Sequence, residues 1–382
     1  MNKSTLLMFL TLMFVAISCG HDYCSRKDFV SLREAELNLV DSVELELDSC
    51  CIPQVNYLKY SYESSLLSFV NPYNNSIYVY DYNNGKLCDI IDLDSLSGGL
   101  AIQGYHIENQ MLYAYSYNKG ILFTADMASG AVSKAIMHVK QDFRSNCIYP
   151  YPYLTTISPL VKHRDFIVSV GYASGESTRE TDDNRPVMTI LNLKSKDLQV
   201  IVNYPELYSK YDWGGTMTYR LPYYCLNEHG DYVISFPACH QLVSGNLNGS
   251  MQSTIVESGC NAIKEIKPYR KYKFIMNHSS DDVWSWYMNN PSYEGILYDK
   301  YRKVYYRFAR LPLPEYKKGD RGNRKPLVVI ILDENLQYLG EYMMPTVVEY
   351  FSTNAFVSER GLNIQVISDN EDVLQFYVYE YE

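Results

Sequence analysis

The sequence has little of what metal-dependent enzymes and common hydrolases show. It contains no Gly-x-Ser-x-Gly elbow, no glycine-rich phosphate loop, no His-Glu-x-x-His pair and no Cys-x-x-Cys pair. Its seven histidines do not cluster along the chain. We therefore expect no metal, no cofactor and no catalytic residue set. A site assembled from distant segments stays open, because repeat folds gather residues that lie far apart in sequence.

Basic charge and long apolar runs are also scarce. Lys and Arg number 34 against 44 Asp and Glu, which gives a formal net charge of −10. This acidic balance, with no long basic patch, argues against nucleic-acid binding. The longest apolar run, Leu6 to Ile17, is shorter than the roughly 20 residues that a transmembrane helix needs.

That apolar run instead has the layout of an export signal. Lys3 precedes it, and the small residues Ala16 and Ser18 lead to Cys19. A cysteine at the cleavage position is typical of bacterial lipoproteins, so we predict cleavage after residue 18 and acylation of Cys19. The alternative is an ordinary signal peptide, because Ala16 stands where lipoproteins usually have Leu. Several acyl chains would anchor the protein stably, and we expect it in the cell envelope, at the outer membrane.

Helical periodicity is almost absent beyond the signal, and short alternating runs replace it. Ile77–Tyr82 alternates, Asn83–Lys86 forms a tight turn, and Leu87–Leu93 returns, which predicts a β-hairpin. Tyrosine is abundant, with 38 Tyr against 13 Phe and 3 Trp. Tyr favours strands, and the alternative is that some of these rings line a ligand groove.

The hairpin pattern recurs, and each hairpin is preceded by another pair of alternating runs. Four antiparallel strands repeating at about 40 residues predict the blades of an all-β propeller. The third blade is expected to begin with strands at Thr155–Val161 and Phe166–Gly171. The stretch Tyr269–Pro291 is irregular and is expected to hold a short helix or an elaborated connection.

The two ends of the chain predict how the ring closes. The C-terminus supplies only three strands, and Leu37–Leu47 is a lone strand that belongs to no early blade. Placing it in the last blade completes four strands and removes an unpaired edge. We therefore predict a signal peptide at 1–18, a tether at 19–36 and a six-bladed propeller at 37–382. Seven blades, if Tyr269–Tyr287 forms one, and an open β-sandwich array are the alternatives.

Several short sequence segments resemble those of a known family. They are the lipoprotein start, residues 74–81 (Asn-Asn-Ser-Ile-Tyr-Val-Tyr-Asp) and residues 233–238 (Val-Ile-Ser-Phe-Pro-Ala). On these the chain resembles the DUF4221 family, propeller-like lipoproteins of Bacteroidetes. The resemblance implies a propeller fold and an envelope location, and it brings no activity with it.

Two aromatic motifs are the candidate ligand-binding residues. Asp212 and Trp213 lie beside Gly214-Gly215, and Asp281 and Asp282 precede Trp284 and Trp286. A flat ring beside a carboxylate suits stacking on a sugar ring and hydrogen bonding to its hydroxyls, and it also suits anchoring a protein. The alternative is that these rings pack the irregular connections between blades.

The sequence supports two hypotheses for the function. The first is a non-catalytic binding or scaffold module, held at the membrane by its lipid and contacting an envelope protein or a glycan. The second is an enzyme that cleaves extracellular glycans with a carboxylate pair in the propeller pocket, since that chemistry needs only two well-placed acids. We favour the binding module because the chain carries no catalytic motif.

Overall fold

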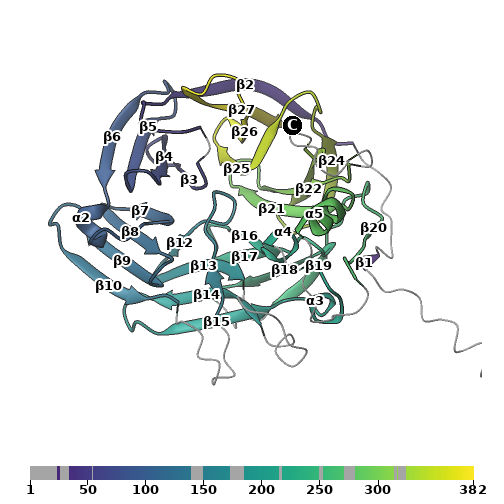
Figure 1. Cartoon of the computed structure of the whole chain (residues 1–382), viewed down its shortest axis with the longest axis horizontal. Helices are drawn as coiled ribbons and strands as arrows, with labels where there is room; N and C mark the ends of the chain where they lie inside the picture. The colour runs from purple at the N-terminus through teal and green to yellow at the C-terminus, as the bar shows by residue number, and fades with distance from the viewer. Residues whose placement is uncertain are drawn as a thin grey trace, which may run out of the picture.

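The computed structural model shows a ring of antiparallel β-sheets (Figure 1). It describes residues 24–25, 34–53, 55–138, 149–172, 185–214, 217–248, 253–270, 280–313, 316 and 324–382. Six sheets form the blades, and strands follow one another outward from the centre of each blade. The prediction of a six-bladed propeller is confirmed.

The first three blades use strands that follow one another along the chain. They are β3(Leu58–Ser61), β4(Leu66–Asn71), β5(Ser76–Asp81) and β6(Leu87–Asp92); then β7(Gly104–Glu108), β8(Met111–Ser116), β9(Ile121–Asp126) and β10(Val132–Ile136); then β11(Tyr151–Pro152), β12(Val161–His163), β13(Phe166–Tyr172), β14(Pro186–Asn192) and β15(Leu198–Asn203). In the third blade β11 and β12 both pair with β13, so two short strands share the innermost position.

The other three blades complete the ring. They are β16(Tyr223–Leu226), β17(Asp231–Ser235), β18(Gln241–Asn246) and β19(Thr254–Glu257); then β21(Ser292–Asp299), β22(Val304–Arg310), β23(Leu327–Asp333) and β24(Tyr338–Met343); then β25(Tyr350–Ser358), β26(Gly361–Val366), β27(Val373–Tyr381) and β2(Leu37–Glu46). The short helices are α2(Asp94–Ser97), α3(Leu207–Lys210), α4(Met217–Arg220) and α5(Ser280–Met288). Helix α5 confirms the expected helix within 269–291. Within the described residues, no helix is long and apolar enough to cross a membrane.

Burial along the blades explains why the strand patterns differ. The middle strands β22 and β23 are buried along almost their whole length, because neighbouring blades cover both faces. The outer strands β6 and β10 are mostly exposed. The sequences of the middle strands are therefore nearly continuous apolar runs, whereas the outer strands can carry many polar residues.

The ring closes through the N-terminal strand, as predicted. Strand β2 pairs antiparallel with β27, from Leu37 opposite Tyr381 to Glu46 opposite Val373 (Figure 1). The predicted turn of the first blade packs against this strand. Gly85 adopts a φ of +71°, and a Cβ placed there would lie 2.0 Å from the Glu44 carbonyl oxygen. Glycine is thus required for the first and last blades to meet.

The centre of the ring is filled by residues 154–160, which we call the plug. The expected strand at Thr155–Val161 is wrong, because Thr155 and Ser158 instead close a tight turn and the strand begins only at Val161. The Thr156 hydroxyl accepts from the Leu58 amide at 2.9 Å and donates to Asn354 Oδ1 at 2.7 Å. Ile157 is fully buried and joins the core of the last two blades. The side chains of this alternating segment pack against distant blades, and its backbone does not pair in a β-ladder.

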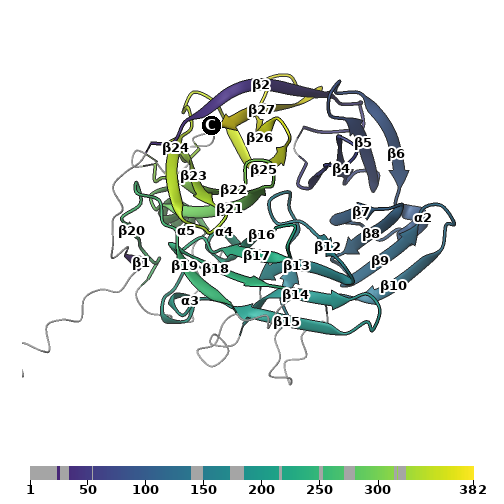
Figure 2. The same ribbon diagram turned by 180° about the vertical axis from the view of Figure 1, so that it is seen from behind.

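Two described stretches ahead of β2 contact the propeller. Cys24 and Ser25 form β1, which pairs with β20(Glu265–Ile266), and both views place this pair at the outside of the ring (Figures 1 and 2). The Ala35 amide donates to the Glu341 carbonyl oxygen at 3.1 Å. Parts of the segment expected to be a tether are therefore docked on the propeller. Cys19 lies outside the described residues.

The two faces of the ring carry different links. Because each blade is a simple antiparallel meander, the connections between blades and the links between second and third strands emerge on one face, which we call the connection face. The remaining turns emerge on the opposite turn face and are short, such as 62–65 and 109–110. The longest links, 204–222, 258–291 and 311–326, all belong to the connection face. Loops of this length usually carry function.

Candidate binding face

The two aromatic motifs singled out in the sequence come together on the connection face. The ring centroids of Trp213 and Trp286 lie 6.4 Å apart, and Tyr219 lies 4.5 Å from Trp286. Gly214 allows this approach, since a Cβ there would lie 2.8 Å from Val283 and 3.2 Å from Trp286. One cluster of aromatic rings thus joins the connection after β15 to helix α5.

Their side chains differ in what they offer a ligand. Trp213 is 3% exposed and its indole N–H donates to the Leu207 carbonyl oxygen at 3.1 Å, so it packs the connection between blades. Asp212 is also buried, and its Oδ1 accepts from the Gly214 amide at 2.8 Å. Trp286 is half-buried, whereas Trp284 is 47% exposed. Of the three Trp residues, Trp284 alone presents much of its ring to solvent.

The two acidic residues of the second motif are exposed. Asp281 and Asp282 lie in the first turn of α5, where the positive end of the helix dipole favours negative charge. Trp284 follows them and lies 5.4 Å from the Tyr287 ring. This end of the helix keeps the combination of carboxylate and exposed ring that the sequence predicted.

A row of tyrosines on the same face was not predicted from the sequence. Tyr151 lies 5.7 Å from Tyr117 and 6.2 Å from Tyr172, and Tyr172 lies 6.3 Å from Tyr153, which is 42% exposed. We call these four residues the tyrosine row. Burial raises the pKa of Tyr172, so its phenol stays protonated at neutral pH and offers a donor. The Tyr-Pro-Tyr sequence at 151–153 was the available signal.

A second group of side chains, the central cluster, lies where the innermost strands meet the connection face. The Arg310 Nε lies 3.2 Å from Glu294 Oε2, and Ser352 donates to the same oxygen at 2.6 Å. The Lys325 ammonium donates to the Asn290 carbonyl oxygen at 2.6 Å and lies 4.1 Å from the centre of the Tyr287 ring. These contacts tie the last two blades to helix α5.

Charges in the central cluster are strongly affected by burial. Lys325 is 4% exposed, and its burial lowers its pKa to about 7, with the Glu294 carboxylate opposing and the Arg310 charge adding to this shift. Burial, together with the Glu294 charge and Tyr153, raises the pKa of Tyr223. Tyr223 therefore lies within electrostatic range of both the central cluster and the tyrosine row.

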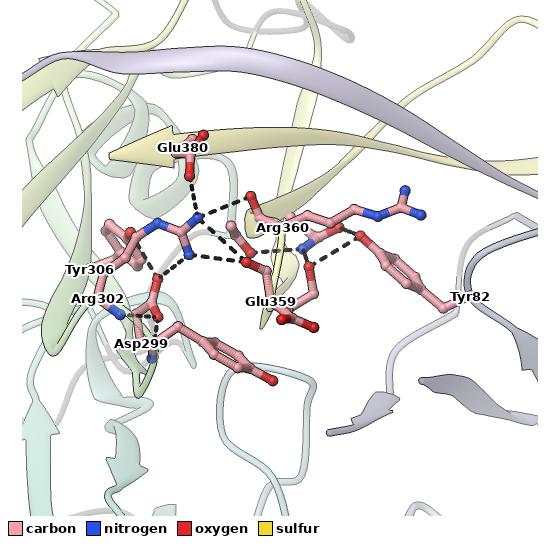
Figure 3. A network of polar contacts seen from close by, with 11 residues as sticks. Tyr82, Asp299, Arg302, Tyr306, Glu359, Arg360 and Glu380 are labelled. Carbon is pink, nitrogen blue, oxygen red and sulfur yellow. Dashed lines mark hydrogen bonds and ion pairs between the residues drawn. The ribbon is translucent and has the colours of Figure 1, made fainter. Parts of the chain in front are cut away.

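The turn face carries a separate polar network (Figure 3). Arg302 lies 3.4 Å from Asp299 and 2.7 Å from Glu380, and it also contacts the backbone of the 359–360 turn. Asp299 is fully buried and accepts from the amides of Tyr301 and Arg302 at 2.9 and 3.0 Å. Nearby, a pocket of about 180 Å³ is lined by residues that include Tyr60, Tyr82 and Arg360. Because nearly every contact in the network satisfies a turn or joins two blades, its role is structural.

Neither face holds a metal-binding group among the residues that the structure describes, since no three His, Cys, Asp or Glu side chains there are placed to share an ion. The carboxylates on the innermost strands are Glu108, Glu294 and Asp299, and each has a cationic partner, respectively Lys162, Arg310 and Arg302. What the connection face offers is aromatic faces, phenol donors and two exposed carboxylates.

Comparisons with known proteins agree with this architecture. Residues 155–343 match the family model described as "Domain of unknown function (DUF4221)". The resemblance to the DUF4221 family is confirmed. A crystal structure of a DUF4221 member from Bacteroides vulgatus superposes with a TM-score of 0.73 at 19% identity, covering 91% of this chain and 99% of that one. At this identity the likeness shows the shared fold.

A second solved structure is more distant. It is titled as a "Putative exported protein" from Bacteroides fragilis, with a TM-score of 0.49 at 11% identity, covering 94% of this chain and 98% of that one. A search of curated proteins finds no match.

The DUF4221 match spans a large part of the candidate binding face, although Tyr117, Tyr151 and Tyr153 of the tyrosine row precede it. It begins at the plug and ends with β24, so it includes both aromatic motifs and Glu294, Arg310 and Lys325 of the central cluster. The DUF4221 segment does not include Cys19 or the closing strand β2.

Proposed function

We propose that this chain is an exported lipoprotein of the cell envelope that acts as a non-catalytic binding module. Its support is the signal layout ending at Cys19 and the resemblance to DUF4221 lipoproteins. The lipid would hold the propeller at the outer membrane. Cys24 in β1 already pairs with β20, so Cys19 lies only five positions before the folded body. A chain of this length spans at most roughly 18 Å.

The observation that carries the binding role is the concentration of partly exposed aromatic side chains on one face. Tyr172 ends strand β13 at the connection face, Tyr153 follows β11, and Trp284 lies in helix α5 of a connection-face link. Protonated phenols and exposed carboxylates accompany them. Rings of this kind stack on sugars and anchor protein partners. We propose an envelope glycan or an envelope protein as the ligand of this face.

The glycan-cleaving alternative has less support. Cleavage needs an acid and a second carboxylate about 5–10 Å apart, both able to act on the substrate. On the innermost strands of the described chain, every carboxylate is held by a Lys or an Arg. A carboxylate that is held by a cation is already engaged with that partner, so it is poorly placed to act on a substrate.

The binding role can be tested with the mature protein and immobilised glycans together with purified envelope proteins. The Tyr153→Ala and Trp284→Ala variants should each lose most of the binding that the wild type shows. Tyr301→Ala is the matched control, because Tyr301 is 39% exposed but lies in a link of the turn face. Equal loss in all three variants, or loss only in Tyr301→Ala, would contradict a ligand on the connection face.

The anchor has its own test. Palmitate added to cells should label the wild type and leave Cys19→Ala unlabelled and released from the membrane fraction. A wild type that stays unlabelled and fractionates away from membranes would show an ordinary signal peptide instead. The binding experiment does not depend on this result, since it uses the protein without its lipid.

A further inference from the structure

Three basic side chains from three different blades converge near the axis of the ring. Lys59 lies on β3, His106 on β7 and Lys162 on β12, each an innermost strand. The Lys59 Nζ lies 2.6 Å from His106 Nδ1, and the Lys162 backbone amide points at the same nitrogen at 3.4 Å. We call these three residues the axial basic cluster.

The hydrogen bonds of the cluster leave a Lys59 donor without an acceptor among the described residues. The Lys59 ammonium lies within hydrogen-bonding distance of His106 Nδ1, and the His106 ring also has the Leu160 backbone as a hydrogen-bond partner. The Lys59 ammonium has three donors, and its two partners in the described structure are His106 and the Leu160 carbonyl oxygen at 3.1 Å. A group that accepts hydrogen bonds is therefore the complement of this site.

The charges point to the same kind of ligand. Among the described residues, the carboxylate beside the cluster is Glu108, which is paired with Lys162. Burial, followed by the neighbouring charges of Lys59 and Lys162, holds the pKa of His106 well below its usual range. Burial likewise lowers the pKa of Lys59 to about 7, against the opposing charge of Glu108. A bound negative charge would relieve this repulsion, in a chain whose net charge is −10.

Solvent reaches the cluster from the turn face. The side chains of Lys162 and Glu108 are 19% and 38% exposed, and both lie toward the end of strands that run to that face. On the other side the plug supplies Leu160, whose carbonyl oxygen already accepts from Lys59. The cluster thus lies between the partly exposed side chains of Lys162 and Glu108 and the plug.

We propose that the axial basic cluster binds a small anion that carries a carboxylate or a phosphate group, entering from the turn face. Lys59 donates to its oxygens, His106 lines the site beside Lys59, and Lys162 supplies further positive charge. The site lies on the face opposite to the proposed glycan- or protein-binding surface, so it is an independent site.

Titration calorimetry on the mature protein tests this, with sodium phosphate and sodium acetate as probes and sodium chloride at matched ionic strength as background. The wild type should bind at least one of the two probes saturably, and Lys59→Met should weaken that binding by about tenfold or more. Lys119→Met is the matched control, because Lys119 is exposed in the link between β8 and β9. It should bind as the wild type does.

A second measurement keeps the proposal testable if Lys59→Met does not fold. The His106 ring signals in an NMR spectrum of the wild type, assigned by their loss in His106→Gln, should shift on addition of the bound probe. Binding by phosphate alone or acetate alone would tell which oxygen group the site accepts. Absence of saturable binding by both probes, or binding that Lys59→Met leaves unchanged, would overturn the proposal.

Discussion

The Arg307 guanidinium lies 3.8 Å from the centre of the Tyr293 ring and is completely buried between the fourth and fifth blades. Its nitrogens donate to the carbonyl oxygens of Cys239, His240 and Ser258 at 2.6 to 2.7 Å. These carbonyls belong to the fourth blade, whereas Arg307 lies on β22 of the fifth. One side chain therefore satisfies several backbone acceptors at a blade interface.

Replacing Arg307 should destabilise the propeller strongly. Arg307→Met removes the donors and leaves buried carbonyls unsatisfied, which costs about 3 kcal/mol or more. Urea unfolding followed by circular dichroism would measure the change. Arg324→Met is the control, because Arg324 pairs with Glu349 at the exposed surface, where an ion pair contributes about 0–1 kcal/mol. Equal midpoints for the two variants would show that the buried contacts contribute little.

The buried Lys325 should make stability depend on pH. Its pKa is about 7 in the folded state and near 10.5 when exposed, so above pH 7 the unfolded chain binds more protons. The contribution of this group therefore makes stability rise with pH between about 7 and 10, by up to about 1.4 kcal/mol per pH unit. Thermal melts of the wild type and Lys325→Met should diverge over this range.

The control for this pH effect is Lys119→Met, whose melts should run parallel to those of the wild type because Lys119 is exposed. If Lys325→Met also runs parallel to the wild type between pH 7 and 10, the lysine titrates in the folded state as it does in water.

Substituting the tryptophans of the two aromatic motifs should change the free energy of unfolding by different amounts. Trp213→Ala removes a buried ring, which should lower the free energy of unfolding by about 3–5 kcal/mol. Trp284→Ala removes a half-exposed ring and should change it by less than about 1 kcal/mol. Chemical denaturation of both variants gives the comparison. A large loss in Trp284→Ala would mean that this ring also holds helix α5 in place.

The plug should contribute to stability through Thr156. Thr156→Val keeps the shape but leaves the Leu58 amide and the Asn354 side chain without this partner, at a cost of about 1–3 kcal/mol. Ser133→Ala on the exposed strand β10 is the control and should be nearly neutral. The denaturant midpoints of the two variants measure the difference, and a neutral Thr156→Val would show that the plug is loosely held.

Much of the blade structure could be predicted because its signals are local. The turn at Asn83–Lys86 specifies its hairpin through residues that are adjacent in sequence, and β5 and β6 begin and end within a residue or so of the expected positions. The ring closure also followed from the sequence, because counting strands left one lone strand at the N-terminus and a blade with only three strands at the C-terminus.

The plug and the binding face could not be predicted, because their contacts join residues far apart in the chain. Thr156 alternates with its neighbours as a strand residue would, yet its partners Leu58 and Asn354 come from the first and last blades. The motifs around Trp213 and Trp286 were both recognised, but their contact depends on the packing of two long links. For Trp213 the structure shows the alternative, a ring that packs the connection between blades.

The pairing of β2 with β27 also determines when the last blade can form during synthesis. Leu37 is among the first residues of the propeller to be synthesised, and its partner Tyr381 is one of the last. The last blade therefore cannot be completed before β27 has been synthesised, and until then β2 has no strand beside it. Closing this very long loop is the slowest kind of contact to form. For an exported chain, that delay would leave the propeller open while the polypeptide is still being moved across a membrane.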